Sequence, residues 1–120
     1  MATHRDLDAW KRSIELVVKV YKITERFPKE EVYGLTSQIR RAAVSIPSNI
    51  AEGAGRTSDK EFMYFLSISI GSLAEVDTQL IICKELKLIT SDIYEQLETD
   101  ITNVRKLILG LRRYLNAKQK

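Results

Sequence analysis

The stretch that decides the fold runs from Tyr33 to Arg56 and reads YGLTSQIRRAAVSIPSNIAEGAGR. Glycine is favoured where a helix ends, so Gly53 predicts a helix over about 35–53. Pro47 lies inside that helix and removes a backbone hydrogen bond, so we expect a kink there. Four apolar residues recur at spacings of three and four, which places them on one side of the helix: Ile39, Ala43, Ile46 and Ile50.

The same periodicity extends outward on both sides of this stretch. It predicts further helices over about 8–26, 59–87 and 92–117, with Ser58 and Glu61 forming a capping-box pattern before the second of these. Four amphipathic helices joined by short connections predict an all-α, antiparallel up-down-up-down four-helix bundle, formed by residues 1–120 as one domain. The residues expected to face the core are Leu7, Trp10 as its anchor, Ile14, Val17 and Tyr21; then Phe62, Leu66, Ser69, Leu73, Val76, Leu80 and Cys83; and then Tyr94, Leu97, Ile101, Val104, Ile108, Leu111 and Leu115.

Composition and length agree with a soluble globular domain, since the chain has 120 residues, of which 44% are apolar and 29% charged. We find no signal-peptide pattern and no apolar run of the ~18 to 20 residues that a membrane-spanning helix needs. We therefore expect a cytoplasmic protein with no membrane partner. The single cysteine, Cys83, excludes an intrachain disulfide and is interpreted as a small buried hydrophobe. The single histidine, His4, excludes most histidine-based catalysis and zinc chemistry.

Positive charge is concentrated at the end of the chain. The formal net charge is +3, yet residues 101–120 carry six lysines and arginines and no acid, so the first hundred residues sum to −3. A basic segment on a mildly acidic body favours an anionic partner, of which nucleic acid is the usual example. The alternative is a solvated helix end, because cations near a helix C-terminus are stabilised by the helix dipole.

Two lines of polar residues interrupt the amphipathic pattern. They lie on the helices over 35–53 and 59–87, beside or opposite the apolar stripes. If these lines face solvent they are outer surface, and if they are covered they must hydrogen-bond to each other or to another chain. The first line is Gln38, Arg41, Ser45, Ser48 or Asn49, and Glu52; the second is Ser72, Glu75 and Gln79.

No pattern in the chain predicts catalysis or a cofactor. The segment Gly53-Ala54-Gly55-Arg56 lacks the spacing of a phosphate-binding loop and follows no strand, so a helix end and a turn is the favoured interpretation. Carboxylate-bridged metal sites in helical bundles need Glu-x-x-His pairs, which this chain cannot supply. We therefore expect no enzyme activity, no metal and no cofactor.

Three blocks of the sequence resemble a known family. DLDAWKRSIELVVKVY, YGLTSQIRRAAVSIPSNIAEGAGR and EFMYFLSISIGSLAEVDTQL are similar to the bacterial four-helix-bundle proteins known as 23S rRNA intervening-sequence proteins, over residues 6 to about 86. The most specific segments are SIPSNIAEG and GSLAE. The resemblance implies a ring-shaped homopentamer. The chain also looks similar to the accessory protein of diversity-generating retroelements, a basic pentamer that binds nucleic acid and works with a reverse transcriptase.

Charge and resemblance together favour a non-enzymatic, oligomeric nucleic-acid-binding or scaffold protein. The alternative is a protein-interaction adaptor with a partner encoded nearby. The sequence does not choose between RNA and DNA, because no aromatic-rich motif interleaves with the basic residues and the tyrosines mostly sit at core spacing. The residues expected to touch phosphates are Arg40, Arg41, Arg56, Arg105, Lys106, Arg112 and Arg113. Those expected at subunit contacts are Gln38, Arg41, Ser45, Asn49, Glu52, Glu75 and Gln79.

Overall fold

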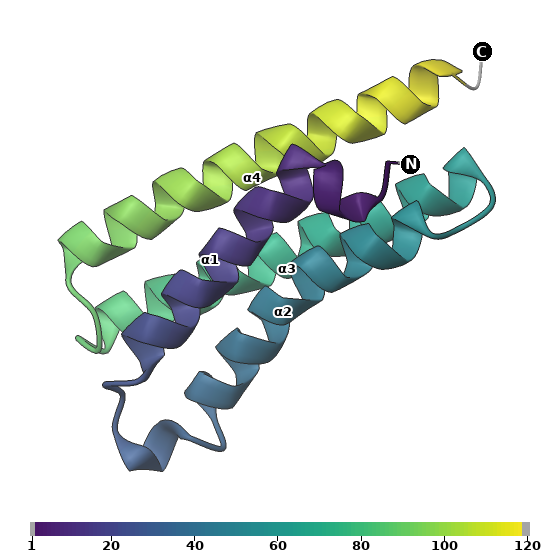
Figure 1. Ribbon diagram of the computed structural model, residues 1–120. Helices are drawn as coiled ribbons and strands as arrows, with labels where there is room; N and C mark the ends of the chain where they lie inside the picture. The colour runs from purple at the N-terminus through teal and green to yellow at the C-terminus, as the bar shows by residue number, and fades with distance from the viewer. Residues whose placement is uncertain (1, 119–120) are drawn as a thin grey trace.

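The computed structural model describes residues 2–118, and within that range the chain forms four α-helices and no β-strand (Figure 1). The all-α fold expected from the sequence is confirmed. Lys120, one of the six basic residues near the chain end, lies outside the described range. The helices are α1 (Asp8–Thr24), α2 (Leu35–Ala54), α3 (Asp59–Glu85) and α4 (Ser91–Lys118), and single 3-10 turns precede α1 and α2 at His4–Asp6 and Lys29–Glu31.

The helices form an elongated bundle in which each one contacts its neighbours in the order α1, α2, α3, α4 and back to α1 (Figure 1). The principal-axis extents are 49 × 24 × 22 Å, with the helices along the long axis. Short connections make sequential neighbours antiparallel. The start of α3 therefore lies beside the end of α4, and this pairing builds the site described below.

Three helices bury the stripes that their spacing predicts. Ile39, Ile46 and Ile50 of α2 are fully buried, and the predicted stripes of α3 and α4 are buried except for Phe62 and Leu111, which are partly covered. Serine hydroxyls fit between α2 and α3 because each finds an acceptor: Ser69 Oγ donates to the Ile46 carbonyl at 2.9 Å.

The core face of α1 differs from the expected one. Trp10 and its stripe are only partly buried or, for Tyr21, exposed, and the residues that point inward are Ala9, Ser13, Leu16, Val20 and Thr24. The two hydroxyls on this face are satisfied within the helix, since Ser13 Oγ donates to the Trp10 carbonyl and Thr24 Oγ1 to the Val20 carbonyl, each at 2.8 Å. Their burial therefore leaves no unpaired polar group, and an apolar stripe stays partly open to solvent.

Gly53 lies inside α2, which continues to Ala54, rather than at its end. A Cβ at Gly53 would come within 2.8 Å of Phe62 Cδ1 and 2.9 Å of Phe65 Cβ. The glycine is therefore needed for the close approach of α3 and not for a special backbone angle. Ser58 caps α3 as expected, because its hydroxyl accepts from the Glu61 backbone N–H at 3.2 Å.

α3 is apolar on more than its core face. It is the one helix among residues 2–118 that is long and apolar enough to cross a membrane, with an 18-residue window of mean hydropathy 1.3. The expectation that no apolar stretch has that length is wrong on this point. One such helix is weak evidence for a membrane span, because the core helix of a bundle meets the same criterion, and α3 packs against both α2 and α4.

Candidate functional site

A groove between the start of α3 and the end of α4 gathers positive charge. It encloses about 580 Å³, and its wall contains three cations and no acid. None of these three cations is in an ion pair within the described chain. We call it the α3/α4 groove; it is lined by Lys60, Met63, Tyr64 and Ser67 of α3 and by Leu109, Arg112, Arg113 and Asn116 of α4.

Two acids flank Lys60 in sequence: Glu61 is exposed, with the Ser58 hydroxyl 3.5 Å from its Oε2, and Asp59 is in an ion pair. Asp59, beside Lys60, pairs with Lys118 across the two helices, with Lys118 Nζ at 3.3 Å from Asp59 Oδ2. The same ammonium lies 5.4 Å from the ring centre of Tyr114. Lys118 thus neutralises the one carboxylate that ties α3 to the end of α4, while Arg112 and Arg113 keep their full charge.

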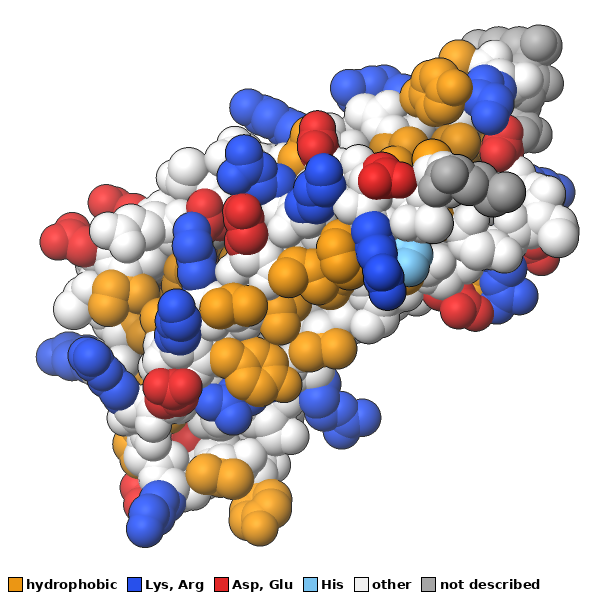
Figure 2. Space-filling view, viewed as in Figure 1, with side chains coloured by type: hydrophobic (Ala, Val, Ile, Leu, Met, Phe, Trp, Pro, Cys, Tyr) orange, Lys and Arg blue, Asp and Glu red, His pale blue; other side chains and the backbone are white. Residues whose placement is uncertain are grey.

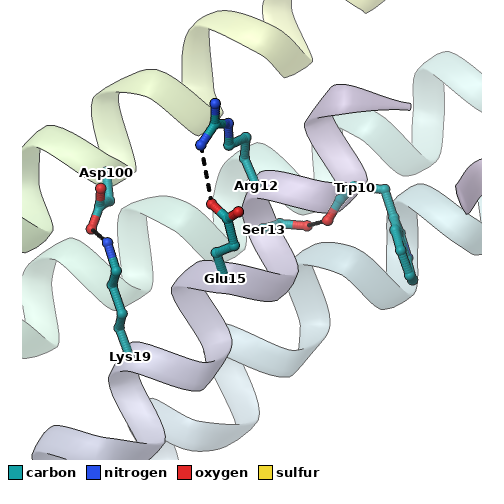
Figure 3. A network of polar contacts seen from close by, with 6 residues as sticks. All are labelled: Trp10, Arg12, Ser13, Glu15, Lys19 and Asp100. Carbon is teal, nitrogen blue, oxygen red and sulfur yellow. Dashed lines mark hydrogen bonds and ion pairs between the residues drawn. The ribbon is translucent and has the colours of Figure 1, made fainter. Parts of the chain in front are cut away.

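A second groove borders α4 on its other side, between α4 and α1, and encloses about 510 Å³. Lys19 Nζ of α1 reaches Asp100 Oδ2 of α4 at 2.8 Å, and Arg12 pairs with Glu15 at 3.2 Å (Figure 3). Three basic and three acidic residues line it, so its formal charge is zero. We call it the α1/α4 groove; its lining is Asp8, Arg12, Glu15, Leu16, Lys19, Asp100, Asn103, Val104, Lys106 and Leu107.

The seven basic residues predicted to touch phosphates do not share one surface. Arg112 and Arg113 line the α3/α4 groove, and Arg105 lies one helical turn before Leu109 on the same side of α4. Lys106 lines the charge-neutral α1/α4 groove instead. Adjacent helical residues point about 100° apart, which is why Arg105 and Lys106 face different neighbours.

Arg40 and Arg56 are largely occupied by contacts within the chain. Arg40 Nε donates to Thr24 Oγ1 at 2.8 Å, and its guanidinium lies 4.5 Å from the ring centre of Tyr21, so it ties α2 to α1. Arg56 pairs with Glu52 at 2.5 Å and lies 4.8 Å from the ring centre of Phe65. Arg41 is exposed beside Arg40, at the opposite end of α2 from Arg56.

The predicted polar lines of α2 and α3 meet in part. Ser45 Oγ and Ser72 Oγ are 2.9 Å apart, and Asn49 Nδ2 donates to the Ser45 carbonyl at 2.8 Å. These hydrogen bonds join the middle of the two polar lines within one chain. The remaining members differ: Gln38, Arg41 and Glu75 are exposed, Glu52 pairs with Arg56, and Gln79 Oε1 is buried with no hydrogen-bond partner among residues 2–118.

The far end of the α3–α4 contact carries both signs of charge, with two carboxylates at the Tyr94 hydroxyl and the Lys84 ammonium 4.8 Å from the centre of its ring. The Tyr94 hydroxyl lies 2.9 Å from Asp77 Oδ1 and 3.0 Å from Glu98 Oε2. Burial, followed by hydrogen bonding to these carboxylates and their charge, raises the pKa of the Tyr94 phenol. Carboxylates therefore enter the α3–α4 contact at this end, whereas the lining of the α3/α4 groove contains none.

The linings of the two grooves contain no histidine and no cysteine. Among residues 2–118, no group of three or more His, Cys, Asp or Glu side chains is arranged to hold a metal ion. Cys83 is fully buried, and that burial raises the pKa of its thiol to about 11, with the charge of Glu31 contributing. A thiol that stays protonated at neutral pH is a poor nucleophile.

Sequence reasoning missed Lys60 and Tyr64. The two lie four residues apart on the side of α3 opposite its core stripe, and this spacing could have identified them as exposed neighbours. The expectation that the tyrosines mostly occupy core positions is also wrong, because Tyr33, Tyr64 and Tyr114 are 97%, 64% and 61% exposed and only Tyr94 is buried.

Comparison with known proteins gives a family and a fold. The family model for the 23S rRNA-intervening sequence protein matches residues 5–110. Among solved structures, the chain is similar to a Bacteroides thetaiotaomicron protein of unknown function from the S23 ribosomal protein family, with 25% sequence identity and a TM-score of 0.77. That similarity covers 87% of this chain and 97% of the other. A search of the curated proteins finds no match.

Proposed function

Because the chain belongs to the 23S rRNA-intervening sequence protein family, we propose that it is a non-enzymatic protein that binds nucleic acid through phosphate contacts in the α3/α4 groove. The observation that carries this proposal is the set of three cations, Lys60, Arg112 and Arg113, in one groove without a single acid. Arginine forks match the oxygens of a phosphate, and a lysine adds a compact point charge.

The expected affinity of one subunit is modest. Three phosphate contacts release the counterions of three phosphates, so the logarithm of the binding constant should fall with the logarithm of salt with a slope of about −2 to −3. Several copies acting on one nucleic acid would raise the apparent affinity without any new contact. Assembly is therefore part of the proposal.

Self-association has two apolar surfaces available. The first lies along α1 and α2, where Figure 2 shows hydrophobic side chains gathered in the middle of the visible face. A shallow hollow on this surface is lined by Trp10, Ile14, Val17, Val18, Val44, Pro47, Ser48 and Ala51. The second is the end of α3, where Ile81, Ile82 and Leu86 are exposed. Two different surfaces favour a head-to-tail contact, which closes into a ring when the rotation allows it.

The predicted polar contact residues lie on α2 and α3. A neighbouring subunit could supply the missing partner of Gln79 Oε1 and cover Gln38, Arg41 and Glu75. The homopentamer is what the family resemblance implies, and native mass spectrometry measures the subunit number directly. A monomer at micromolar concentration would contradict the assembly proposal and would leave the groove to act alone.

Fluorescence anisotropy tests the binding proposal. Labelled RNA and DNA are titrated at 20 mM and 150 mM salt with the wild type, with the double variant Arg112→Ala, Arg113→Ala, and with a control, Arg12→Ala, Lys106→Ala, that removes the same charge from the α1/α4 groove. Salt-dependent binding that only the first variant loses supports the proposal. Equal losses in both variants, or wild-type binding that does not respond to salt, would contradict it.

A second candidate is an adaptor that binds a protein partner encoded nearby. The apolar surface along α1 and α2 favours it, because contiguous exposed apolar groups mark interaction sites. It replaces the first proposal if the wild type binds neither RNA nor DNA at 20 mM salt and if a nuclease-treated pull-down recovers one protein that Val18→Asp, Val44→Asp no longer captures.

A further inference from the structure

We infer that the α3/α4 groove takes a single strand of nucleic acid, with one base stacked on the ring of Tyr64 and its neighbouring phosphates on Lys60, Arg112 and Arg113. This inference rests on the proposed function and adds the kind of nucleic acid that the groove selects.

Tyr64 is an exposed aromatic side chain in a groove that three cations also line. Its side chain is 64% exposed although it lies on a well-formed helix, and its ring meets Phe65 edge-on, with centroids 5.3 Å apart and planes at 81°. Phe65 restricts the position of the ring without covering it. A positioned aromatic ring between cations is the combination that single-strand-binding proteins use, because every base has a π-face and every linkage has a phosphate.

A duplex cannot use this tyrosine. Paired bases are stacked on each other, so their faces are closed to a side chain, whereas an unpaired base can turn out and stack on an aromatic ring. Asn116, in the same wall, offers an amide to a base edge or a sugar, and Ser67 Oγ, which donates to the Met63 carbonyl at 3.1 Å, can still accept a hydrogen bond. The cations alone would bind any nucleic acid, so Tyr64 is the element that distinguishes a single strand.

The other exposed tyrosines lack this setting. The Tyr21 ring has the Arg40 guanidinium 4.5 Å from its centre, and the hollow it lines contains an acid, Glu25. The Tyr114 ring already has the Lys118 ammonium at 5.4 Å from its centre, and Tyr33 belongs to the connection between α1 and α2, far from the groove along the bundle. The α1/α4 groove contains no aromatic residue in its lining. Tyr64 is therefore the one tyrosine in the described chain that lines a wholly basic groove.

The geometry also limits the length of strand that one subunit holds. The groove runs from Lys60 to Ser67 on α3, which is roughly 10 Å at the helical rise per residue. Further along the α3–α4 contact, Asp77 and Glu98 lie at the Tyr94 hydroxyl and Lys84 lies against its ring, so the wholly basic lining does not continue there. At the ~3.4 Å spacing of stacked nucleotides, one subunit would hold about three of them.

The test compares a fluorescein-labelled dT12 strand with a labelled 12-base-pair duplex at one salt concentration. We expect Tyr64→Ala to weaken dT12 binding by roughly 5- to 100-fold, the range for loss of one stacked base, with little change for the duplex. Tyr64→Phe should keep most of the dT12 affinity, because it retains the ring. Tyr33→Ala is the matched control and should bind both probes like the wild type. Circular dichroism melting of each variant verifies the fold.

The outcomes separate the two proposals. If Tyr64→Ala binds dT12 as well as the wild type while Arg112→Ala, Arg113→Ala does not, the stacking inference is overturned and the phosphate proposal stands. Equal weakening of strand and duplex by Tyr64→Ala also overturns it, since the tyrosine would then act without regard to base pairing. If the wild type binds neither probe at low salt, the proposed function itself fails.

Discussion

α4 borders two grooves of nearly equal size that differ in charge. The α1/α4 groove, of about 510 Å³, holds equal numbers of acids and bases, and the α3/α4 groove, of about 580 Å³, holds bases alone. Arg105 and Lys106 are adjacent in sequence, yet Lys106 lines the neutral groove while Arg105 lies on the other side of α4. The neighbouring helix, and not the charge of α4, therefore decides whether a cation of α4 lies in a groove with acids or in one without them.

The two grooves also differ in what connects their walls. Lys19 of α1 reaches across to Asp100 of α4, so part of the polar surface of the α1/α4 groove is used to join the helices. In the α3/α4 groove the joining pair, Lys118 with Asp59, lies at the edge and leaves the lining cations unpaired. The α1/α4 groove is thus a polar contact between two helices, and the α3/α4 groove is an open surface with unpaired positive charge.

Charge reversal should have the largest effect on this contrast. We expect Arg112→Glu, Arg113→Glu to lower the affinity for RNA or DNA by at least about 100-fold at 20 mM salt, because two attractive contacts become repulsive. The same reversal in the other groove, Arg12→Glu, Lys106→Glu, should change affinity much less. Anisotropy titration measures both. Comparable losses in the two variants would mean that net charge, rather than the α3/α4 groove, controls binding.

Gly53→Ala should displace α3, which forms one wall of the α3/α4 groove, and leave the α1/α4 groove in place. A Cβ at this position meets Phe62 and Phe65 at 2.8 and 2.9 Å, so α3 must shift away from α2. We expect a loss of about 1–3 kcal/mol in the free energy of unfolding, as overpacked sites show, measured by urea denaturation. Gly71→Ala is the control, because a Cβ there meets nothing within 4 Å. An unchanged stability for Gly53→Ala would show that the α2–α3 contact is looser than described.

Ser67→Asp should give the α3/α4 groove an acid in its lining, as the α1/α4 groove has. The new carboxylate would lie among Lys60, Arg112 and Arg113, as Asp100 lies beside Lys19 in the α1/α4 groove. We expect about a 10-fold loss of affinity, equal to one Coulomb interaction of ~1–2 kcal/mol near a protein surface. Ser67→Asn has the shape of the aspartate variant without its charge and should lose much less affinity than Ser67→Asp. Equal behaviour of the two variants would show that Ser67 does not face the bound phosphates.

The fold could be predicted from the sequence wherever a helix carries one apolar stripe. The stripes of α2, α3 and α4 are buried as their spacing indicates. α1 carries two neighbouring stripes, and apolar spacing chose the one with Trp10. Ser13 and Thr24 belong to the buried one because their hydroxyls bond to backbone carbonyls one turn earlier, a contact that an apolar pattern does not register.

Only the α4 half of the candidate site could be predicted from the sequence. Arg112 and Arg113 stood out because the end of the chain is basic. Lys60 and Tyr64 did not, because their meaning depends on a helix about fifty residues away. The antiparallel order of the bundle places the start of α3 beside the end of α4, and only that pairing makes one groove from the two pairs of residues.

The Lys19–Asp100 pair should have the smallest effect, although it is the most visible link in the α1/α4 groove (Figure 3). The Lys19 and Asp100 side chains are 53% and 28% exposed, and exposed ion pairs typically contribute only ~0.2–1 kcal/mol. We expect Lys19→Met, which keeps the apolar stem, to lower the free energy of unfolding by less than about 1 kcal/mol. The difference should shrink in 1 M salt, and nucleic-acid affinity should stay within about twofold of the wild type.

A loss above about 2 kcal/mol in Lys19→Met would contradict this view of the groove. It would mean that the ion pair, and not the burial of Leu16 and Val104 beneath it, holds α1 against α4. Asp100→Asn provides the complementary measurement, because it removes the charge and keeps the size of the side chain. If both variants lose the same small amount of unfolding free energy, the apolar contact beneath the groove, and not its polar lining, holds α1 against α4. The ion pairs then distinguish the two grooves by their charge and not by their contribution to stability.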